Sequence, residues 1–298
     1  MVLRTAYGEI STHQSEMYED NITIKSVIAD ERSILHTPYG AFILNYTMEE
    51  PRKKYKASAE FYKNGQLRAV YLEQAALIHT KAGDIPVEHI TFYEHGGIHR
   101  LFPLYGQLNG YWTEENEYEL AEEIKLSALG DHLICKPLCL CFYPDGNLQS
   151  VTIWNRTELT VPTGSGPIKT RHGFSVYEDG SLQSVEPVFG TVLQTKYGRI
   201  HAYDMEYNVF HADHNSLEFD RNGNLMSYST IHTVVSLYKE KNKIREIRPA
   251  KVPDPFGGDY MVIKPMLVCM TAGGITVNLG NSTETSFFSE QDYDIQFE

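Results

Sequence analysis

Residues 142–151 read Phe-Tyr-Pro-Asp-Gly-Asn-Leu-Gln-Ser-Val, and this stretch decides the fold because versions of it recur along the 298-residue chain. Two aromatic residues enter a turn in which Pro144 presets φ, Asp145 can bond to the local backbone, and Gly146 takes a positive φ. A leucine, two polar residues and a valine follow, in the pattern of a strand with one buried face. The stretch therefore predicts a β-hairpin with a connection of about three to five residues.

Further stretches align with this one on the turn residue. The close copies are residues 61–70, 92–101, 176–185 and 219–228, with Gly65, Gly96, Gly180 and Gly223 at the turn. A looser copy at residues 17–27 has Asn21 in place of glycine, and asparagine is among the few other residues that tolerate a positive φ. Residues 269–277, with Gly273 at the turn, are interpreted as a degenerate last copy.

The spacing of the copies is typical of a repeat protein. The turn glycines lie 31, 50, 34 and 43 residues apart, as in propeller blades or solenoid repeats with insertions. A second signature alternates with the first and has threonine three residues before glycine, with isoleucine two or three residues after it. It occurs at Thr37, Thr80, Thr163 and Thr195. Each unit is therefore predicted to contain two turns and about three short strands.

The repeat is interrupted between residues 105 and 130, which accounts for the 50-residue spacing. Residues 105–112 are predicted to form a loop. Thr113 can cap a short helix near residues 113–123, whose first turn carries glutamates that suit the helix dipole. This is the one helix that the sequence predicts.

The sequence therefore predicts an all-β protein of tandem antiparallel hairpin repeats, which form an elongated or curved sheet with one short inserted helix. Residues 1–280 are expected to form a continuous β-repeat domain with an insertion at 105–130, and residues 281–298 a polar, acidic tail or cap. A closed propeller is disfavoured because the units have about three strands where a blade has four, and their spacing is uneven. Two small β domains that meet at the insertion are the third arrangement.

Composition and charge favour strands and exclude some partners. The chain has 20 tyrosines and 13 phenylalanines, which favour strands over helices. Its formal net charge of −13 argues against a surface for nucleic acid or an anionic membrane, because such a surface is basic. The basic runs at residues 52–54 and 239–248 are interpreted as solvated residues at strand edges. The expected partner is a protein or a small molecule.

The sequence also favours a cytoplasmic location. The N-terminal residues lack the apolar core of a secretion signal, and no run of about 18 apolar residues occurs. Cys135, Cys139 and Cys141 crowd one strand region while Cys269 is distant, a distribution that is no disulfide framework. We expect the three neighbouring cysteines to pack in the core as small apolar residues.

The chain resembles a family of uncharacterised bacterial β-hairpin repeat proteins through four stretches. These are Gly-Tyr-Trp-Thr-Glu-Glu at 110–115, Val-Pro-Thr at 161–163, Tyr-Glu-Asp-Gly-Ser-Leu at 177–182 and Asp-His-Asn-Ser-Leu at 213–217. This resemblance implies a hairpin architecture and no activity. The aromatic-aromatic-x-Asn-Gly-x-Leu hairpin is also similar to variant MORN repeats, although the spacing here is longer and less regular. The second likeness again implies architecture alone.

The densest group of metal-ligand residue types lies after the fourth copy of the hairpin. On a loop, His211, Asp213 and His214 can converge on zinc or another divalent transition metal, with His201 or Asp204 completing the shell. The alternative is a polar insertion between strands with exposed histidines. The spacing matches no recognised metal motif.

The insertion supplies a second candidate site. Tyr105, Tyr111 and Trp112 are expected to line a binding surface beside Glu114 and Glu115, because insertions in repeat proteins often fall on the face that binds. The alternative is that Trp112 fills the core where the repeat is interrupted.

The sequence contains no nucleophile elbow, P-loop or dinucleotide fingerprint. The favoured hypothesis is therefore a non-enzymatic binding or scaffold module without a cofactor. The alternative is a metal-binding protein or metal-dependent hydrolase that uses the histidines and aspartates of residues 201–215.

Overall fold

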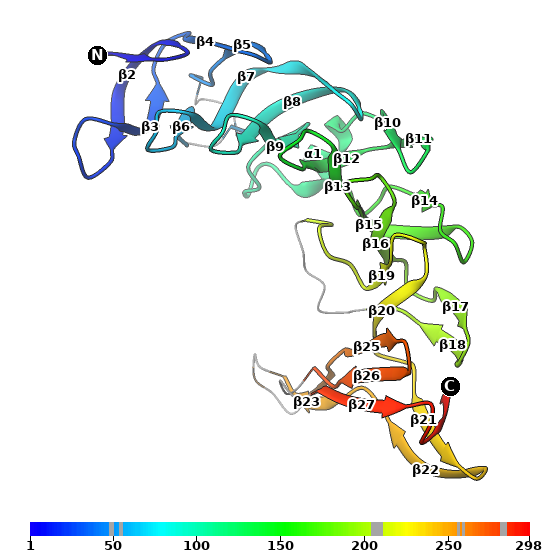
Figure 1. Cartoon of the computed structure of the whole chain (residues 1–298). Helices are drawn as coiled ribbons and strands as arrows, with labels where there is room; N and C mark the ends of the chain where they lie inside the picture. The colour runs from blue at the N-terminus through cyan, green and yellow to red at the C-terminus, as the bar shows by residue number, and fades with distance from the viewer. Residues whose placement is uncertain (48–50, 54–55, 204–210, 255–256, 258–259, 281–284) are drawn as a thin grey trace. The chain divides into compact units, whose positions relative to one another are not determined.

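The computed structural model describes residues 1–47, 51–53, 56–203, 211–254, 257, 260–280 and 285–298 (Figure 1). Within these residues the regular elements are β-strands, apart from a single helix, α1 (Glu114–Leu120). The prediction of an all-β chain of antiparallel hairpins with one short helix is therefore confirmed. The chain divides into two compact units, Met1–Trp154 and Asn155–Glu298.

The first unit is built on one antiparallel sheet. Its strands lie in the order β1 (Val2–Thr5), β2 (Gly8–Met17), β3 (Ile24–Ala29), β6 (Ala59–Phe61), β7 (Leu67–Thr80), β8 (Gly83–Phe92), β9 (Ile98–Phe102), β12 (Pro137–Phe142) and β13 (Leu148–Ile153). Two separate hairpins, β4–β5 (Ile34–Thr37 and Gly40–Ile43) and β10–β11 (Ile124–Ala128 and Asp131–Cys135), lie in connections between its strands. The sheet is thus built of consecutive hairpins that lie side by side.

The second unit repeats this plan. Its main sheet runs β14 (Leu159–Val161), β15 (Ile168–Val176), β16 (Leu182–Pro187), β19 (Leu217–Phe219), β20 (Leu225–Thr230), β25 (Met266–Thr271), β26 (Gly274–Asn278) and β27 (Thr285–Ser289). A smaller sheet has the order β17 (Val192–Thr195), β18 (Gly198–His201), β28 (Asp294–Phe297), β21 (Val235–Lys239) and β22 (Asn242–Ile247). Strands β23 (Lys251–Pro253) and β24 (Met261–Ile263) form a hairpin. Within residues 285–298, Phe288, Ile295 and Phe297 are buried.

The recurring hairpin has one turn geometry in its copies. In residues 142–151, the amide of Gly146 donates to the carbonyl of Tyr143 at 2.9 Å, and the amide of Tyr143 donates to the carbonyl of Asn147 at 2.8 Å. Gly146 has φ +81°, and the strand register shifts beside Phe142, as in a hairpin closed by a glycine bulge. The looser copy has the same turn conformation, since Asn21 also has a positive φ, +53°.

Tyrosine hydroxyls link one hairpin to the next. The tyrosine at the second position of a copy donates to the backbone carbonyl of the phenylalanine at the first position of the following copy, at 2.7 or 2.8 Å. The pairs are Tyr18 with Phe61, Tyr62 with Phe92, Tyr93 with Phe142, and Tyr177 with Phe219. The repeated aromatic pair therefore holds neighbouring hairpins in register as well as supplying apolar surface.

The threonine-glycine signature marks a second kind of turn. The hydroxyl of Thr80 donates to the carbonyl of Gly83 at 2.8 Å and accepts the amide of Ala82 at 3.1 Å. The same bonds occur at Thr37, Thr163 and Thr195, and also at Thr5. The expected hairpin copy at residues 269–277 belongs to this second kind. Thr271 pairs with Gly274, so Gly273 lies in a two-residue connection and has no positive φ. The Thr271 hydroxyl does not make the hydrogen bonds of the other threonines.

The core is largely aromatic and aliphatic, and it includes the neighbouring cysteines. Cys135, Cys139 and Cys141 are buried in the core, as the strand pattern predicts. Burial raises the pKa of the Cys135 thiol to about 12, with the carboxylate of Glu123 adding to the effect. These cysteines therefore act as packing residues.

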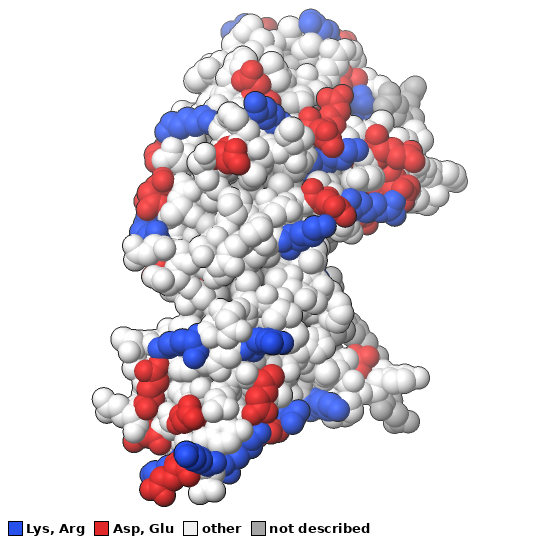
Figure 2. Space-filling view, turned by 90° about the vertical axis from the view of Figure 1, so that its right-hand side faces the viewer, with Lys and Arg blue, Asp and Glu red and all other residues white. Residues whose placement is uncertain are grey.

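Charged side chains of both signs are mixed on the face shown in Figure 2. In the described ranges, no helix has the length and apolar character needed to cross a membrane.

Candidate functional site

The predicted binding surface lies in the connection between β9 and β12. These two strands pair directly, with Leu101 opposite Leu140 and Arg100 opposite Cys141. The connection therefore leaves the sheet and returns to the neighbouring position, and the sheet is complete without it. Helix α1 and the loop before it are an addition to the repeat.

Helix α1 begins where the sequence predicts. Thr113 is the N-cap: its side chain accepts the amide of Asn116, and the Asn116 side chain accepts the amide of Thr113 in return. This reciprocal capping satisfies two amide groups that a helix N-terminus leaves without partners. The helix ends at Leu120, two turns later, because Ala121 has extended backbone angles.

The carboxylate of Glu117 is the centre of the insertion. Its side chain is on α1 and is buried, with the residue 3% exposed. It accepts the indole N–H of Trp112 at 2.7 Å and the amide of Gly106 at 2.7 Å. It also accepts two bonds from the guanidinium of Arg52, both at 2.8 Å. One carboxylate thereby ties the helix to the loop before it and to the connection that follows β5.

Arg52 joins this centre to the sheet. Its Nη1 and Nη2 atoms donate to both carboxylate oxygens of Glu88 on β8, at 2.9 and 2.7 Å. Burial lowers the pKa of Arg52, but the hydrogen bonds and charges of Glu88 and Glu117 outweigh burial and raise it above its ordinary value. The guanidinium is therefore a fixed positive charge between two carboxylates.

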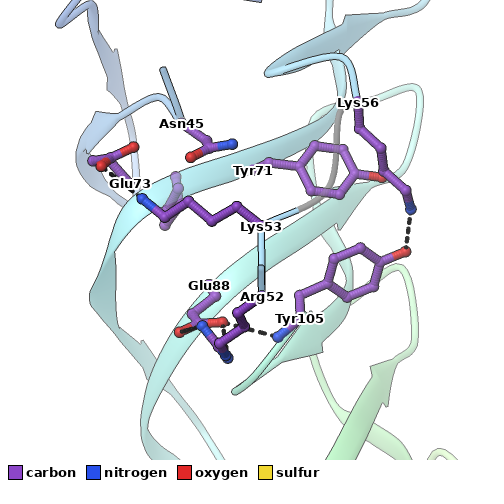
Figure 3. Close-up of a pocket in the computed structure, with 9 residues that line it drawn as sticks. Asn45, Arg52, Lys53, Lys56, Tyr71, Glu73, Glu88 and Tyr105 are labelled. Carbon is purple, nitrogen blue, oxygen red and sulfur yellow. Dashed lines mark hydrogen bonds and ion pairs between the residues drawn. The ribbon is translucent and has the colours of Figure 1, made fainter. Parts of the chain in front are cut away.

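Tyr105 lines a small pocket beside this ion pair (Figure 3). Its amide donates to Glu88 at 2.9 Å, and its hydroxyl accepts the ammonium of Lys56 at 3.0 Å. Lys56 also lies over the rings of Tyr105 and Tyr71, at 4.6 and 5.3 Å from their centroids. Burial raises the pKa of Tyr71, and the nearby Tyr105 adds to the shift.

The pocket is too small for a metabolite. Its volume is about 50 Å³, which suits a few water molecules. Lys53 on its wall pairs with Glu73 at 2.7 Å, and Glu73 also accepts the amides of Tyr46 and Thr47. The charged side chains on the pocket wall are thus bonded to neighbouring residues, and these bonds hold the insertion in place.

The five predicted surface residues fall into two groups. Tyr105 and Trp112 face inward and bond to Lys56 and Glu117. Tyr111 is 89% exposed, and Glu114 and Glu115 are exposed in the first turn of α1. The inward pair anchors the loop, and the outward residues are available for contact. We call residues 105–112 the aromatic loop.

The predicted metal ligands are spread over the second unit. His201 ends β18, His211 and Asp213 are half-buried before β19, and His214 is exposed there. Asp204 lies outside the described residues. Among those that are described, no three His, Cys, Asp or Glu side chains are grouped so that they could hold one metal ion. The metal hypothesis stays a prediction.

Sequence reasoning missed the residues that organise both regions. Arg52 and Lys53 were expected to be solvated, but their side chains are 17% and 15% exposed and both pair with glutamates. That part of the prediction is wrong because the paired glutamates come from distant strands and a helix. The only available signal was the high density of charges near residue 52. His232 lies beside His201 in space, and nothing in the sequence around it indicated this contact.

Comparison with known proteins identifies no relative. No protein-family model matches the chain, no curated protein matches its sequence significantly, and no solved structure matches its fold significantly. The function must therefore be inferred from the residues of this chain.

Proposed function

We propose that the chain is a non-enzymatic binding module that holds a protein partner on the aromatic loop and the first turn of α1. The sheet of the first unit is the scaffold for this surface. One observation carries the proposal. The buried carboxylate of Glu117 fixes the aromatic loop, while large apolar side chains of that loop face the solvent.

Tyr111 and Leu108 are the exposed apolar residues of the loop, at 89% and 61%. Their backbone is held by Asn109, whose side chain accepts the amides of Tyr111 and Trp112 at 2.7 and 2.9 Å. The same side chain donates to the carbonyl of Pro51 at 2.7 Å. A loop that is already ordered loses little conformational entropy on binding, so its apolar contacts contribute more fully to affinity.

Tyrosine is also the kind of residue that dominates binding energy at interfaces. Its ring buries a large apolar area, and its side chain has few rotatable bonds to immobilise. Exposed apolar residues occur singly on most proteins, but here two lie within four residues on a loop that the sheet does not need. This arrangement supports a binding role for the loop.

The charge around the loop indicates the chemistry of the partner. Glu114, Glu115 and Glu119 are exposed on α1, and no basic residue is present in the last turn of this helix. A partner segment with an aliphatic or aromatic anchor, flanked by lysine or arginine, complements this surface in both shape and sign. We therefore expect association to weaken as ionic strength rises.

The experiment that tests the proposal places a photo-crosslinking amino acid at position 111 of the full chain in its native cells. The matched control carries the same group at Tyr260, which is 77% exposed in the second unit. The proposal expects one protein to be captured at position 111 and not at 260, and to carry basic residues beside an apolar anchor. Identical capture at both positions, or specific substrate turnover by the purified chain, contradicts it.

A further inference from the structure

The second unit contains a pocket that the aromatic loop does not share. It is lined by Phe189, Gly190, Thr191, His201, Ala202, Tyr203, His232 and Glu298. Its volume is about 490 Å³, within the range of about 300 to 1,000 Å³ that is usual for small-molecule sites. This volume is large enough for one ring system with a substituent.

Aromatic rings form the wall of this pocket. Phe189 lies edge-on to Tyr203, with ring centroids 5.2 Å apart, and edge-on to His232 at 5.7 Å. Phe189 is nonetheless 66% exposed, because the rings meet at their edges and leave faces open. Open aromatic faces favour a flat ring that can stack on them.

The Tyr203 ring is held in place by a buried ion pair. Glu186 on β16 is 0% exposed and accepts two bonds from the guanidinium of Arg171, at 2.8 and 3.2 Å, as well as the amide of Ser216 at 2.7 Å. Arg171 donates to the hydroxyl of Tyr203 at 3.1 Å, and its guanidinium carbon lies 4.2 Å from the ring centroid. A rigid wall of this kind reduces the ordering cost of binding.

Two imidazoles lie among the polar side chains of the pocket, beside Thr191 and Glu298. The rings of His201 and His232 lie 6.4 Å apart, and neither makes a hydrogen bond or ion pair to any residue that the structure describes. Their backbones are fixed, since the amide of His201 donates to Thr233 and that of His232 donates to Thr230. A neutral imidazole has one nitrogen that donates and one that accepts.

We infer that this pocket binds a small planar heteroaromatic molecule, whose ring stacks on Phe189, meets Tyr203 edge-on and bonds through its own edge to His201 and His232. A heteroaromatic edge carries a donor, an acceptor or both, and the two kinds of imidazole nitrogen can pair with either. The guanidinium of Arg171 lies over one face of the Tyr203 ring, so the exposed Phe189 is the ring that offers a face for stacking. The pocket is separate from the aromatic loop, so a negative result in the binding test would leave the proposed function unaffected.

The test measures binding of adenosine, indole and nicotinamide to the full chain by ligand-observed NMR, at concentrations up to about 1 mM. The inference expects at least one of them to bind in this range, and expects Phe189→Ala and His232→Ala each to weaken it about tenfold. Phe287→Ala is the matched control, because Phe287 is 57% exposed on β27 and outside the pocket.

Two outcomes overturn the inference. The first is that none of the three molecules binds. The second is that binding is equally strong in the Phe189 and His232 variants, which would locate it elsewhere. Circular dichroism of each variant confirms the fold, and since both residues are exposed these substitutions should leave it intact.

Discussion

The hydroxyl of Tyr93 donates a hydrogen bond to the backbone carbonyl of Phe142, 2.7 Å away, although 49 residues separate them in the chain. Tyr93 begins the turn of one hairpin, and Phe142 enters the turn of the next. The same relationship joins Tyr62 to Phe92 and Tyr177 to Phe219. The insertion between β9 and β12 therefore leaves the linkage between consecutive hairpins unchanged.

Removing this hydroxyl should destabilise the first unit. Tyr93→Phe keeps the ring and leaves the Phe142 carbonyl without this donor, so we expect a loss of about 1 kcal/mol in the free energy of unfolding. Urea denaturation followed by circular dichroism measures it. Tyr111→Phe is the control, because that side chain is exposed and should change stability by less than about 0.5 kcal/mol. Equal stability of the two variants would contradict the role of the linkage.

The buried carboxylate of Glu117 should control order in the aromatic loop. Glu117→Gln keeps the shape but removes the charge that binds Arg52, Gly106 and Trp112, so we expect a cost of about 1 to 3 kcal/mol. Hydrogen exchange of the Gly106 amide should accelerate. The control is Glu119→Gln, an exposed residue on the same helix. Unchanged exchange in the Glu117 variant would show that the loop is held by other contacts.

Replacing a turn glycine by alanine should destabilise the protein where that glycine has a positive φ. Gly146 has φ +81° with open space around it, so Gly146→Ala should cost about 1 to 2 kcal/mol from backbone strain alone. Gly273→Ala should be close to neutral, because Gly273 has no positive φ and also faces open space. Thermal unfolding of both variants measures the difference. A larger loss at Gly273 would restore the interpretation of residues 269–277 as a hairpin of the first kind.

The carboxylate of Asp179, in the turn of one hairpin, gives a prediction for how stability depends on pH. Bonds from the hydroxyl and amide of Ser181, followed by Arg221, lower the pKa of Asp179 to about 2. Because the folded-state pKa is lowered, the stabilisation is present above the ordinary pKa of about 3.8 and is lost as the pH falls toward 2. Carboxyl titration by NMR should show this pKa, and Ser181→Ala should raise it. An ordinary pKa for Asp179 in the intact chain would refute the turn geometry.

The sequence predicts those features that depend on local conformation. Gly146 and Asn21 take positive φ because few other residues do so at low cost, and Thr113 caps α1 with an acidic first turn after it. These signals lie within a few residues of one another. The amino-acid sequence alone is therefore enough to locate the hairpins and the helix.

The long-range partners could not be predicted in this way. Arg52 pairs with Glu88 and Glu117, which are 36 and 65 residues away, and nothing local distinguishes it from a solvated arginine. His201 lies beside His232 rather than in a metal-binding group among the described residues, because the hydroxyls of Thr230 and Thr233 bond to the His201 backbone. The two turn types also share glycine, so residues 269–277 fit either pattern until the register of β25 and β26 is known.

The central claim is that the aromatic loop binds a protein through Tyr111, and calorimetric titration with the captured partner tests it most directly. We predict that Tyr111→Ala weakens binding at least about tenfold, since exposed tyrosines on ordered loops commonly dominate an interface. Tyr260→Ala should bind as the unmodified chain does, because that residue lies in the second unit. If Tyr111→Ala binds with undiminished affinity, the aromatic loop is not the binding surface.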